Sequence, residues 1–159
     1  MGGRGLMRLW RLCSARHAQS FDGGYGLLYD GRWNSVGHAV TYCSTSPSLC
    51  VLEKLVHVED PLLLPKLVMV TYGVPDDLAT RSISLDDLSA DWRGREGFTQ
   101  ELGNVWHRSL STPILRVPSA IVPLKGSPDV NVLINHKHPG VAEIKLISAE
   151  LFVFDPRLL

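Results

Sequence analysis

The chain has 159 residues, which is enough for one domain with a hydrophobic core. Its 16 Lys and Arg residues balance its 16 Asp and Glu residues, so the formal net charge at pH 7 is zero. A protein that binds nucleic acid on its own normally carries a surplus of positive charge, so this balance argues against direct nucleic-acid binding.

The N-terminus and the cysteines indicate a cytoplasmic protein without a membrane anchor. No apolar run approaches the length that spans a bilayer, and the arginines near the N-terminus precede no secretory apolar segment. Cys13, Cys43 and Cys50 are odd in number and lack CxxC spacing, which favours core thiols in a reducing compartment over disulfides or a zinc site. Residues 1–7 are expected to be a structureless leader, followed by one domain over residues 8–159.

The first third of the chain predicts two strands, a long loop and a helix. Residues 8–12 alternate between apolar and polar side chains like a strand, and residues 39–43 are rich in β-forming side chains. Between them, residues 23–37 contain five glycines and are expected to form a loop. Ser46 followed by a proline is the usual start of a helix, which we expect to run to about His57.

The rest of the chain predicts mostly strands. Residues 66–72 form a valine-rich strand, residues 76–97 suggest no regular element, and residues 98–110 have the apolar spacing of a helix. Five further segments look like strands: 114–117, 120–124, 132–134, 143–147 and 151–154. Strands outnumber helices, so the expected fold class is α/β of the α+β type, a single domain of short mixed strands with few helices.

Glu53 lies at the margin of the apolar face of the helix that starts after Ser46. On a helical wheel it falls beside Leu49, just outside the apolar arc, where a carboxylate can reach into a cleft at the rim of the core. Tyr42 on the preceding strand could place its ring in the same cleft. The alternative is that Glu53 is a solvated residue on the flank of the helix.

The segment from Gly31 to Gly37 is a candidate ligand-binding loop. Its glycines allow a tight turn or a close approach of the backbone to a ligand, and the guanidinium of Arg32 offers a planar set of donors that suits phosphate. The alternative is a turn that is held in place by the packing of Trp33.

Several motifs, in this order along the chain, resemble the RES-domain family, which is named for an arginine, a glutamate and a serine. The similarity covers residues 8–158, with two departures, Asp30 in place of a second glycine and His136 in place of a proline. The matching motifs are Trp10-Arg11, Gly31-Arg32-Trp33-Asn34, Tyr42, Glu53, Leu115-Arg116-Val117-Pro118-Ser119-Ala120, Asn131 with Asn135, His138-Pro139 and Phe154-Asp155-Pro156-Arg157-Leu158.

The resemblance implies a fold like that of ADP-ribosyltransferases and a toxin that consumes NAD as substrate, with no prosthetic group. Cleavage of the nicotinamide–ribose bond passes through an oxocarbenium-like transition state, and water or phosphate would accept the ADP-ribose. Arg32, Glu53 and Ser119 would be catalytic residues. Arg11 and Arg32 would bind the diphosphate, Tyr42 would stack on the ligand, and Ser119 would bond the ligand or orient Glu53.

The family also implies partners. An Xre-type antitoxin is expected to block the cleft and to make any DNA contacts, and a homodimer within a larger toxin–antitoxin complex is compatible with the family. Three other functions remain open: ADP-ribosylation of a protein acceptor, a non-catalytic antitoxin-binding module and, disfavoured by the neutral charge, a toxin that cuts RNA.

Single residues also have structural interpretations. Arg11 could form a structural ion pair, Tyr42 could be a core tyrosine with a satisfied hydroxyl, and Ser119 could simply begin a strand. His136 and His138 have no evident third ligand, so no metal site is predicted. A Ser–His–Asp hydrolase that uses Ser119 and Asp155 lacks the expected GxSxG pattern.

Overall fold

The computed structural model describes residues 5–159, which form a mixed seven-stranded sheet with the strand order β4-β5-β6-β2-β1-β3-β7. All neighbouring strands are antiparallel except β4 and β5. The strands are β1 (Leu6–Ser14), β2 (Val40–Ser44), β3 (Leu67–Pro75), β4 (Thr80–Ser82), β5 (Ile114–Pro118), β6 (Val130–Asn135) and β7 (Lys145–Phe152). The α-helices are α1 (Gly24–Leu28), α2 (Pro47–Leu55) and α3 (Glu96–Ser109). This single domain with few helices confirms the predicted fold class.

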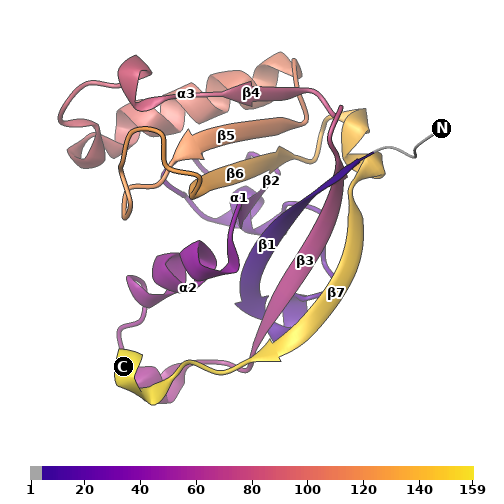
Figure 1. The fold of residues 1–159 in the computed structure, drawn as a ribbon. Helices are drawn as coiled ribbons and strands as arrows, with labels where there is room; N and C mark the ends of the chain where they lie inside the picture. The colour runs from indigo at the N-terminus through magenta and orange to yellow at the C-terminus, as the bar shows by residue number, and fades with distance from the viewer. Residues whose placement is uncertain (1–4) are drawn as a thin grey trace.

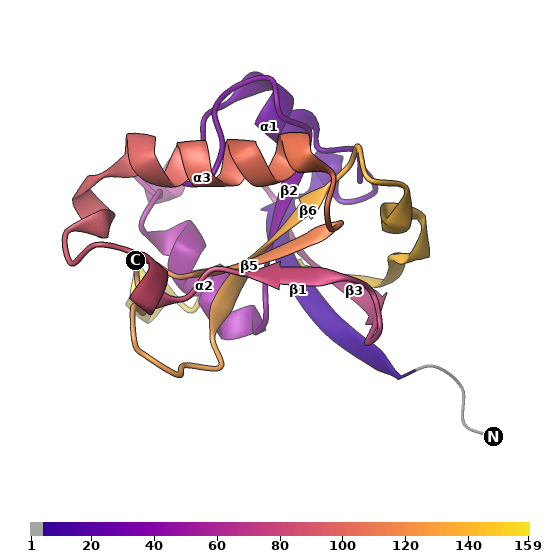
Figure 2. The same ribbon diagram turned by 90° about the horizontal axis from the view of Figure 1, so that it is seen from above.

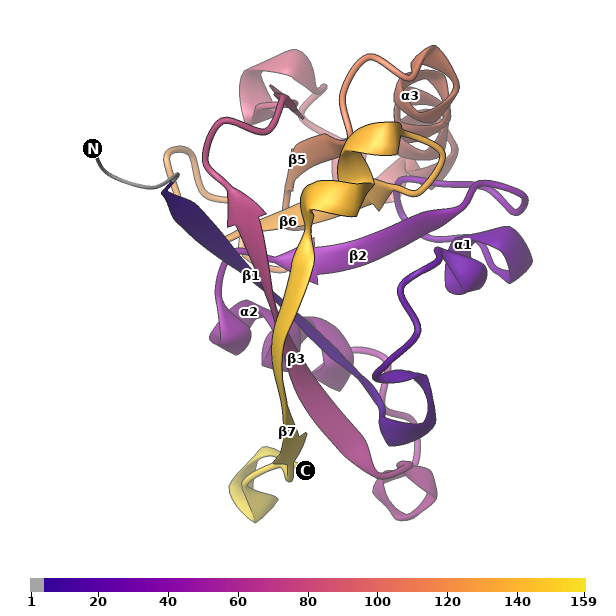
Figure 3. The same cartoon turned by 90° about the vertical axis from the view of Figure 1, so that its right-hand side faces the viewer.

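The sheet consists of two halves that meet at a steep angle. β1 pairs with β3 along its whole length, from Leu6 to Ser14, but with β2 only through Trp10 and Ser44. In Figures 1 and 3, β1, β3 and β7 run steeply across the direction of β5, β6 and β2. Helix α2 contacts both β1 and β2, so it lies where the two halves meet.

The two faces of the sheet carry two separate cores. The first, here called the cysteine face, includes Cys13 and Cys43 together with Leu9, Val70, Tyr72, Val132 and Ile134. The second, here called the tryptophan face, includes Trp33, Trp92 and Trp106 together with Val40, Leu115, Val117 and Leu133. Helix α3 covers the tryptophan face (Figure 2). Because side chains alternate along a strand, this division determines which residues of β2 and β6 can share a site.

Two predictions about the N-terminal region are wrong. β1 begins at Leu6, so Leu6 and Met7 belong to the sheet and not to a leader, whereas residues 1–4 lie outside the described residues. The predicted glycine-rich loop contains the short helix α1. The glycines of α1 serve close packing: a Cβ on Gly26 would lie 2.3 Å from the carbonyl oxygen of His38.

The predicted strand at residues 120–124 is also wrong. The Ser119 hydroxyl accepts hydrogen bonds from the backbone N–H groups of Ile121 (3.0 Å) and Val122 (3.2 Å), which turns the chain directly after β5. The two strands predicted at residues 143–147 and 151–154 form the single strand β7. The pairing of β7 with β3 shifts register between Thr71 and Tyr72.

Other expectations are confirmed with small changes at the ends of the elements. Ser46 caps α2 by accepting a hydrogen bond from the Leu49 N–H, and that helix ends at Leu55, before the predicted His57. The polar stretch 76–97 contains little regular structure apart from β4, two 3-10 turns, Leu85–Asp87 and Trp92–Gly94, and the start of α3, which begins at Glu96 and not at the predicted residue 98.

The three cysteines are buried and unpaired, as expected for core residues. Within residues 5–159, none of the helices combines the length and the apolar character that a bilayer span would need.

Candidate functional site

Three elements converge on the carboxylate of Glu53. The side chain extends from α2, and its Oε1 atom accepts hydrogen bonds from Ser119 Oγ (2.9 Å), just after β5, and from Asn131 Nδ2 (2.7 Å), on β6. Ser119 is almost fully buried, and Glu53 is half-buried. Of the two roles expected for Ser119, the structure therefore shows the contact with Glu53.

Asn131 is a site residue that sequence reasoning missed, because it was named only among the family motifs and was given no role in the site. It lies within β6, directly opposite Ser44 on β2, and its Oδ1 atom accepts a hydrogen bond from Ser44 Oγ at 2.9 Å. Asparagine is unfavourable inside strands, so a strand that begins Val-Asn-Val could have signalled a specific hydrogen-bonding role.

The loop that carries Arg32 is a tight turn tied to Tyr42. Its ends meet through a 2.9 Å hydrogen bond from the Gly31 N–H to the Asn34 carbonyl. The Tyr42 hydroxyl accepts a hydrogen bond from the Trp33 N–H (3.0 Å) and donates one to Asn34 Oδ1 (2.6 Å). A Cβ on Gly31 would lie 2.5 Å from that hydroxyl, so this position requires glycine. Trp33 is buried, in agreement with its predicted packing role.

Tyr42 therefore combines the two interpretations that the sequence left open. Its hydroxyl is satisfied inside the protein, as in a core tyrosine, but its ring is only partly buried. Burial raises the pKa of Tyr42 above its usual range, and the nearby charge of Arg32 opposes this shift only weakly. The phenol thus stays protonated at neutral pH, which preserves its donor role toward Asn34.

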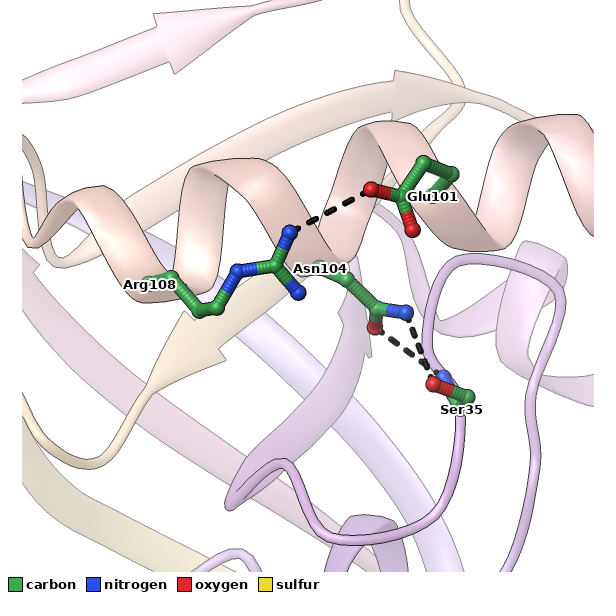
Figure 4. A network of polar contacts seen from close by, with 4 residues as sticks. All are labelled: Ser35, Glu101, Asn104 and Arg108. Atoms are coloured by element: carbon green, nitrogen blue, oxygen red, sulfur yellow. Dashed lines mark hydrogen bonds and ion pairs between the residues drawn. The ribbon is translucent and has the colours of Figure 1, made fainter.

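Helix α3 holds the same loop from the other side. Asn104 accepts a hydrogen bond from the Ser35 N–H (3.1 Å) and donates one to the Ser35 hydroxyl (2.7 Å), as Figure 4 shows. On another side of the helix, Glu101 and Arg108 form an exposed ion pair at 3.2 Å (Figure 4). The contacts drawn in Figure 4 are thus an anchor of the loop and an ion pair on the surface.

Two further residues of α3 contact the loop that carries Arg32. The Thr99 hydroxyl donates to the carbonyl oxygen of Arg32 at 2.6 Å. A Cβ on Gly103 would lie 1.7 Å from the carbonyl oxygen of Trp33, so helix and loop backbone are in direct contact there. The backbone of the loop is therefore fixed on both sides.

The guanidinium of Arg32 retains unused hydrogen-bonding capacity. Its Nη1 atom donates to the Arg93 carbonyl at 3.2 Å, and its Cζ lies 5.7 Å from the centre of the Trp92 ring. A guanidinium has five N–H donors, and among the described residues Arg32 makes no other side-chain hydrogen bond. A half-buried cation with free donors next to an aromatic ring is suited to bind an anion.

Arg11 is not brought together with these residues. It lies on β1 with the same orientation as Leu9 and Cys13, on the cysteine face, and its Nη1 atom donates to the Ser20 carbonyl (2.8 Å) and to the Tyr72 hydroxyl (3.3 Å). Glu53 instead meets β2 and β6 on the tryptophan face. Arg11 thus makes hydrogen bonds where an ion pair was one of its two interpretations, and it lies apart from Glu53 and the Arg32 loop.

Hydrogen bonds link the other predicted residues to the two strands β2 and β6. Tyr42 and Ser44 point to the same face of β2, two residues apart, or about 7 Å along the strand. Tyr42 binds the Arg32 loop, and Ser44 binds Asn131, which binds Glu53. The site therefore offers a cation with free donors and a carboxylate on one surface, which suits a ligand that is anionic at one end and becomes electron-poor at the other.

The histidines do not form a metal centre. Among residues 5–159, no three His, Cys, Asp or Glu side chains gather closely enough to hold an ion. His136 bonds the Thr41 hydroxyl through Nε2 (2.7 Å), and burial lowers its pKa to about 4. His138 Nδ1 accepts a hydrogen bond from the Gly140 N–H at 2.9 Å, which makes it a turn residue.

Comparison with known proteins found one matching family and several similar proteins. Residues 8–155 match the RES domain. Two similar proteins are both named Toxin Res: one from Photorhabdus laumondii, 33% identical over 96% of this chain and 97% of its own, and one from Pseudomonas putida, 35% identical over 96% and 99%. A third, from Sphingobium, is named Prs ADP-ribosylating toxin and is 33% identical over 94% of this chain and 95% of its own.

The fold is also shared with a solved structure. The structure of the M. tuberculosis MbcT–MbcA toxin–antitoxin complex contains a chain that superposes with a TM-score of 0.70 over 94% of this chain and 86% of its own, at 17% identity. With the RES-domain match over nearly its whole length and relatives above 30% identity, the chain belongs to the RES domain family.

Proposed function

We propose that this protein is the toxin of a toxin–antitoxin pair and that it depletes NAD by cleaving the bond between nicotinamide and ribose. The observation that carries the proposal is the Glu53 carboxylate, which has Oε1 bound by two donors and Oε2 without a hydrogen bond among the described residues. The names of the similar proteins, Toxin Res and Prs ADP-ribosylating toxin, support both the toxin assignment and the use of NAD.

Arg32 would bind the diphosphate. A guanidinium can contact two phosphate oxygens at once, and this one has free donors on a loop whose backbone is fixed from two sides. The partly buried ring of Tyr42 lies beside this loop and would pack against the ribose or the nicotinamide. Arg11 is left out of the proposed site because it lies on the opposite face of the sheet.

Glu53 would act on the ribose. Its free Oε2 atom would accept a hydrogen bond from a ribose hydroxyl and stabilise the positive charge that grows at the anomeric carbon. As the glycosidic C–N bond breaks, its electron pair goes to the ring nitrogen, and the cationic pyridinium leaves as neutral nicotinamide. A water or phosphate oxygen then bonds to the anomeric carbon, and a water acceptor loses a proton to solvent.

A second candidate is the transfer of ADP-ribose to a protein, which the name of the Sphingobium relative favours. Both reactions share the cleavage step and differ only in the acceptor. In either case we propose that the toxin acts in the cytoplasm of its own cell and is held inactive by an Xre-type antitoxin. The fold shared with the MbcT–MbcA complex supports an antitoxin partner, and a homodimer within that assembly is part of the proposal.

Proton NMR of NAD incubated with antitoxin-free protein tests the proposal. We expect release of free nicotinamide, and a drop of at least about 100-fold in the Glu53→Gln variant, because the charge that faces the ribose is lost. Glu101→Gln is the matched control, since Glu101 lies in an exposed ion pair on α3. A requirement for phosphate would indicate phosphorolysis, and release without phosphate would indicate hydrolysis.

Absence of nicotinamide from folded protein would contradict cleavage with water or phosphate as acceptor. Labelled NAD with cell extract would then separate ADP-ribosylation of a protein from a non-catalytic antitoxin-binding module, because only a transferase would label a protein.

A further inference from the structure

We propose that Asn131 and Ser44 are positioning residues that hold one oxygen of Glu53 in place and so present the other to the substrate. This inference rests on the proposed function, because it assigns a role within the same site. It concerns a pair of side chains on β2 and β6 that lie behind the carboxylate.

The contacts of Glu53 are unequal. Ser119 and Asn131 both donate to Oε1, at 2.9 and 2.7 Å, so the two lone pairs of that oxygen are occupied. Oε2 accepts no hydrogen bond from any described residue. Rotation of the carboxylate that exchanged the two oxygens would break both bonds during the turn. The two oxygens of a carboxylate are equivalent, so the two donors fix the orientation of the group and leave one oxygen without a hydrogen bond from the described residues.

Ser119 can act toward Glu53 only as a donor. Its oxygen already accepts two backbone hydrogen bonds, from Ile121 at 3.0 Å and Val122 at 3.2 Å. Its single hydroxyl proton points to Glu53 Oε1, and the side chain is buried. Ser119 is therefore a fixed hydrogen-bond donor to the carboxylate and not a nucleophile.

Ser44 fixes the orientation of the Asn131 side-chain amide. An asparagine amide has a donor end and an acceptor end, and Ser44 donates to its acceptor, Oδ1, at 2.9 Å, which leaves Nδ2 toward Glu53. A flipped amide would place two acceptor oxygens, Oδ1 and Oε1, against each other. Ser44 and Asn131 are also directly paired residues of the β2–β6 ladder, and Ser44 is buried, so their separation is set by the backbone.

Loss of either residue would leave the carboxylate in place but free to rotate. Binding of NAD through its diphosphate depends on the Arg32 loop, which neither Ser44 nor Asn131 contacts among the described residues. The effect should therefore fall on kcat and not on KM. A poorly oriented catalytic group typically reduces turnover by about 10- to 100-fold.

The kinetic test compares two pairs of variants. Asn131→Ala should lower kcat by about 10- to 100-fold, with KM for NAD within about twofold of the parent value. Ser44→Thr and Ser44→Val have nearly the same shape, and only threonine keeps the hydroxyl. We expect Ser44→Thr to retain at least about tenfold more activity than Ser44→Val. Equal activity of these two, or a change confined to KM, would overturn the inference.

A second readout does not depend on turnover. In a ¹⁵N-labelled protein, the side-chain amide resonance of Asn131 should move when Glu53→Gln replaces its carboxylate acceptor, and should stay in place in Glu101→Gln. An unmoved resonance would overturn the inference even if NAD is cleaved. If the parent protein does not cleave NAD, the proposed function fails, whereas this resonance still reports whether Asn131 is bonded to Glu53. Thermal unfolding of each variant identifies any that fail to fold.

Discussion

Two arginine–tyrosine pairs lie on opposite faces of the sheet and differ in the contacts that they make. Arg11 donates directly to the Tyr72 hydroxyl and to the Ser20 carbonyl on the cysteine face. Arg32, on the tryptophan side, has one hydrogen bond and an aromatic neighbour, while Tyr42 uses its hydroxyl to bind the backbone of the Arg32 loop. Residue type alone does not distinguish the pairs. Arg11 makes two hydrogen bonds within the protein, whereas Arg32 makes one and lies against the Trp92 ring.

The residues around the two arginine–tyrosine pairs also differ in their contacts. Around Arg11, Phe21 packs on Tyr72 with ring centres 4.7 Å apart and on His136 at 4.6 Å, and His136 bonds Thr41. On the other face, Glu53 lies beside a chain of polar donors and keeps one carboxylate oxygen free. A buried polar network that satisfies itself stabilises a fold, whereas a fixed network with spare acceptors and donors is prepared for a ligand.

The largest expected effect comes from separating α3 from the Arg32 loop. In Gly103→Ala, the new Cβ would meet the Trp33 carbonyl oxygen at 1.7 Å, so the loop or the helix must shift. We expect a loss of about 3 kcal/mol or more in the free energy of unfolding, measured in urea, and loss of activity with it. Gly97→Ala is the control on the same helix, because nothing lies within 4 Å of its Cβ, and we expect it to be neutral or slightly stabilising. An unchanged free energy of unfolding in Gly103→Ala would show that α3 and the Trp33 carbonyl are not in close contact.

Substitution of each arginine tests which of the two faces binds NAD. Arg32→Lys should raise KM for NAD by about tenfold, since a lysine cannot contact two phosphate oxygens in a planar manner. Arg11→Lys should leave KM unchanged and lower the thermal midpoint, because it breaks contacts with Tyr72 and Ser20. Steady-state kinetics and thermal unfolding of both variants check this, and the reverse pattern would place the site on the cysteine face.

A further expected effect is a pH dependence of the free energy of unfolding, which belongs to the cysteine face. Burial lowers the pKa of His136 from 6.5 to about 4, while Asp22 opposes the shift and Arg11 and His107 add to it. The unfolded chain therefore takes up a proton more readily than the folded one. The contribution of His136 is fully present above pH 6.5 and is lost as the pH falls, by at most about 2 kcal/mol at pH 5.

Urea unfolding of the parent and of His136→Gln at pH 7 and pH 5 measures this contribution. The parent should lose more stability than the variant on acidification. An equal loss in both proteins would show that His136 is as easily protonated in the folded state as in the unfolded one.

Much of the fold could be predicted from local patterns, and the errors arose where local patterns mislead. Ser46 followed by Pro47 correctly marked the start of α2, because a capping signal needs only adjacent residues. Residues 120–124 looked like a strand, but the hydroxyl of Ser119 holds the backbone of this segment in a turn. The glycines before Arg32 suggested a loop, whereas Gly26 is a packing contact within α1.

The site could be predicted only in part. The family motifs identified Glu53 and Ser119, which are 66 positions apart in sequence and in direct contact in the fold. Asn131 was missed as a site residue because its contact with Glu53 depends on the pairing of β2 with β6, which no local pattern reveals. For Arg11, alternation with Leu9 and Cys13 could have indicated a shared face, but the face that carries Glu53 was not known.

Mapping NAD on the Glu53→Gln variant by the backbone amide resonances that NAD perturbs tests whether the tryptophan face is the NAD site. We expect changes in the Gly31–Ser35 loop, at Tyr42 and at Asn131, and none at Arg11, Ser20 or Tyr72. Changes confined to the second group, or no changes at millimolar NAD, would contradict the assignment of the tryptophan face as the NAD site.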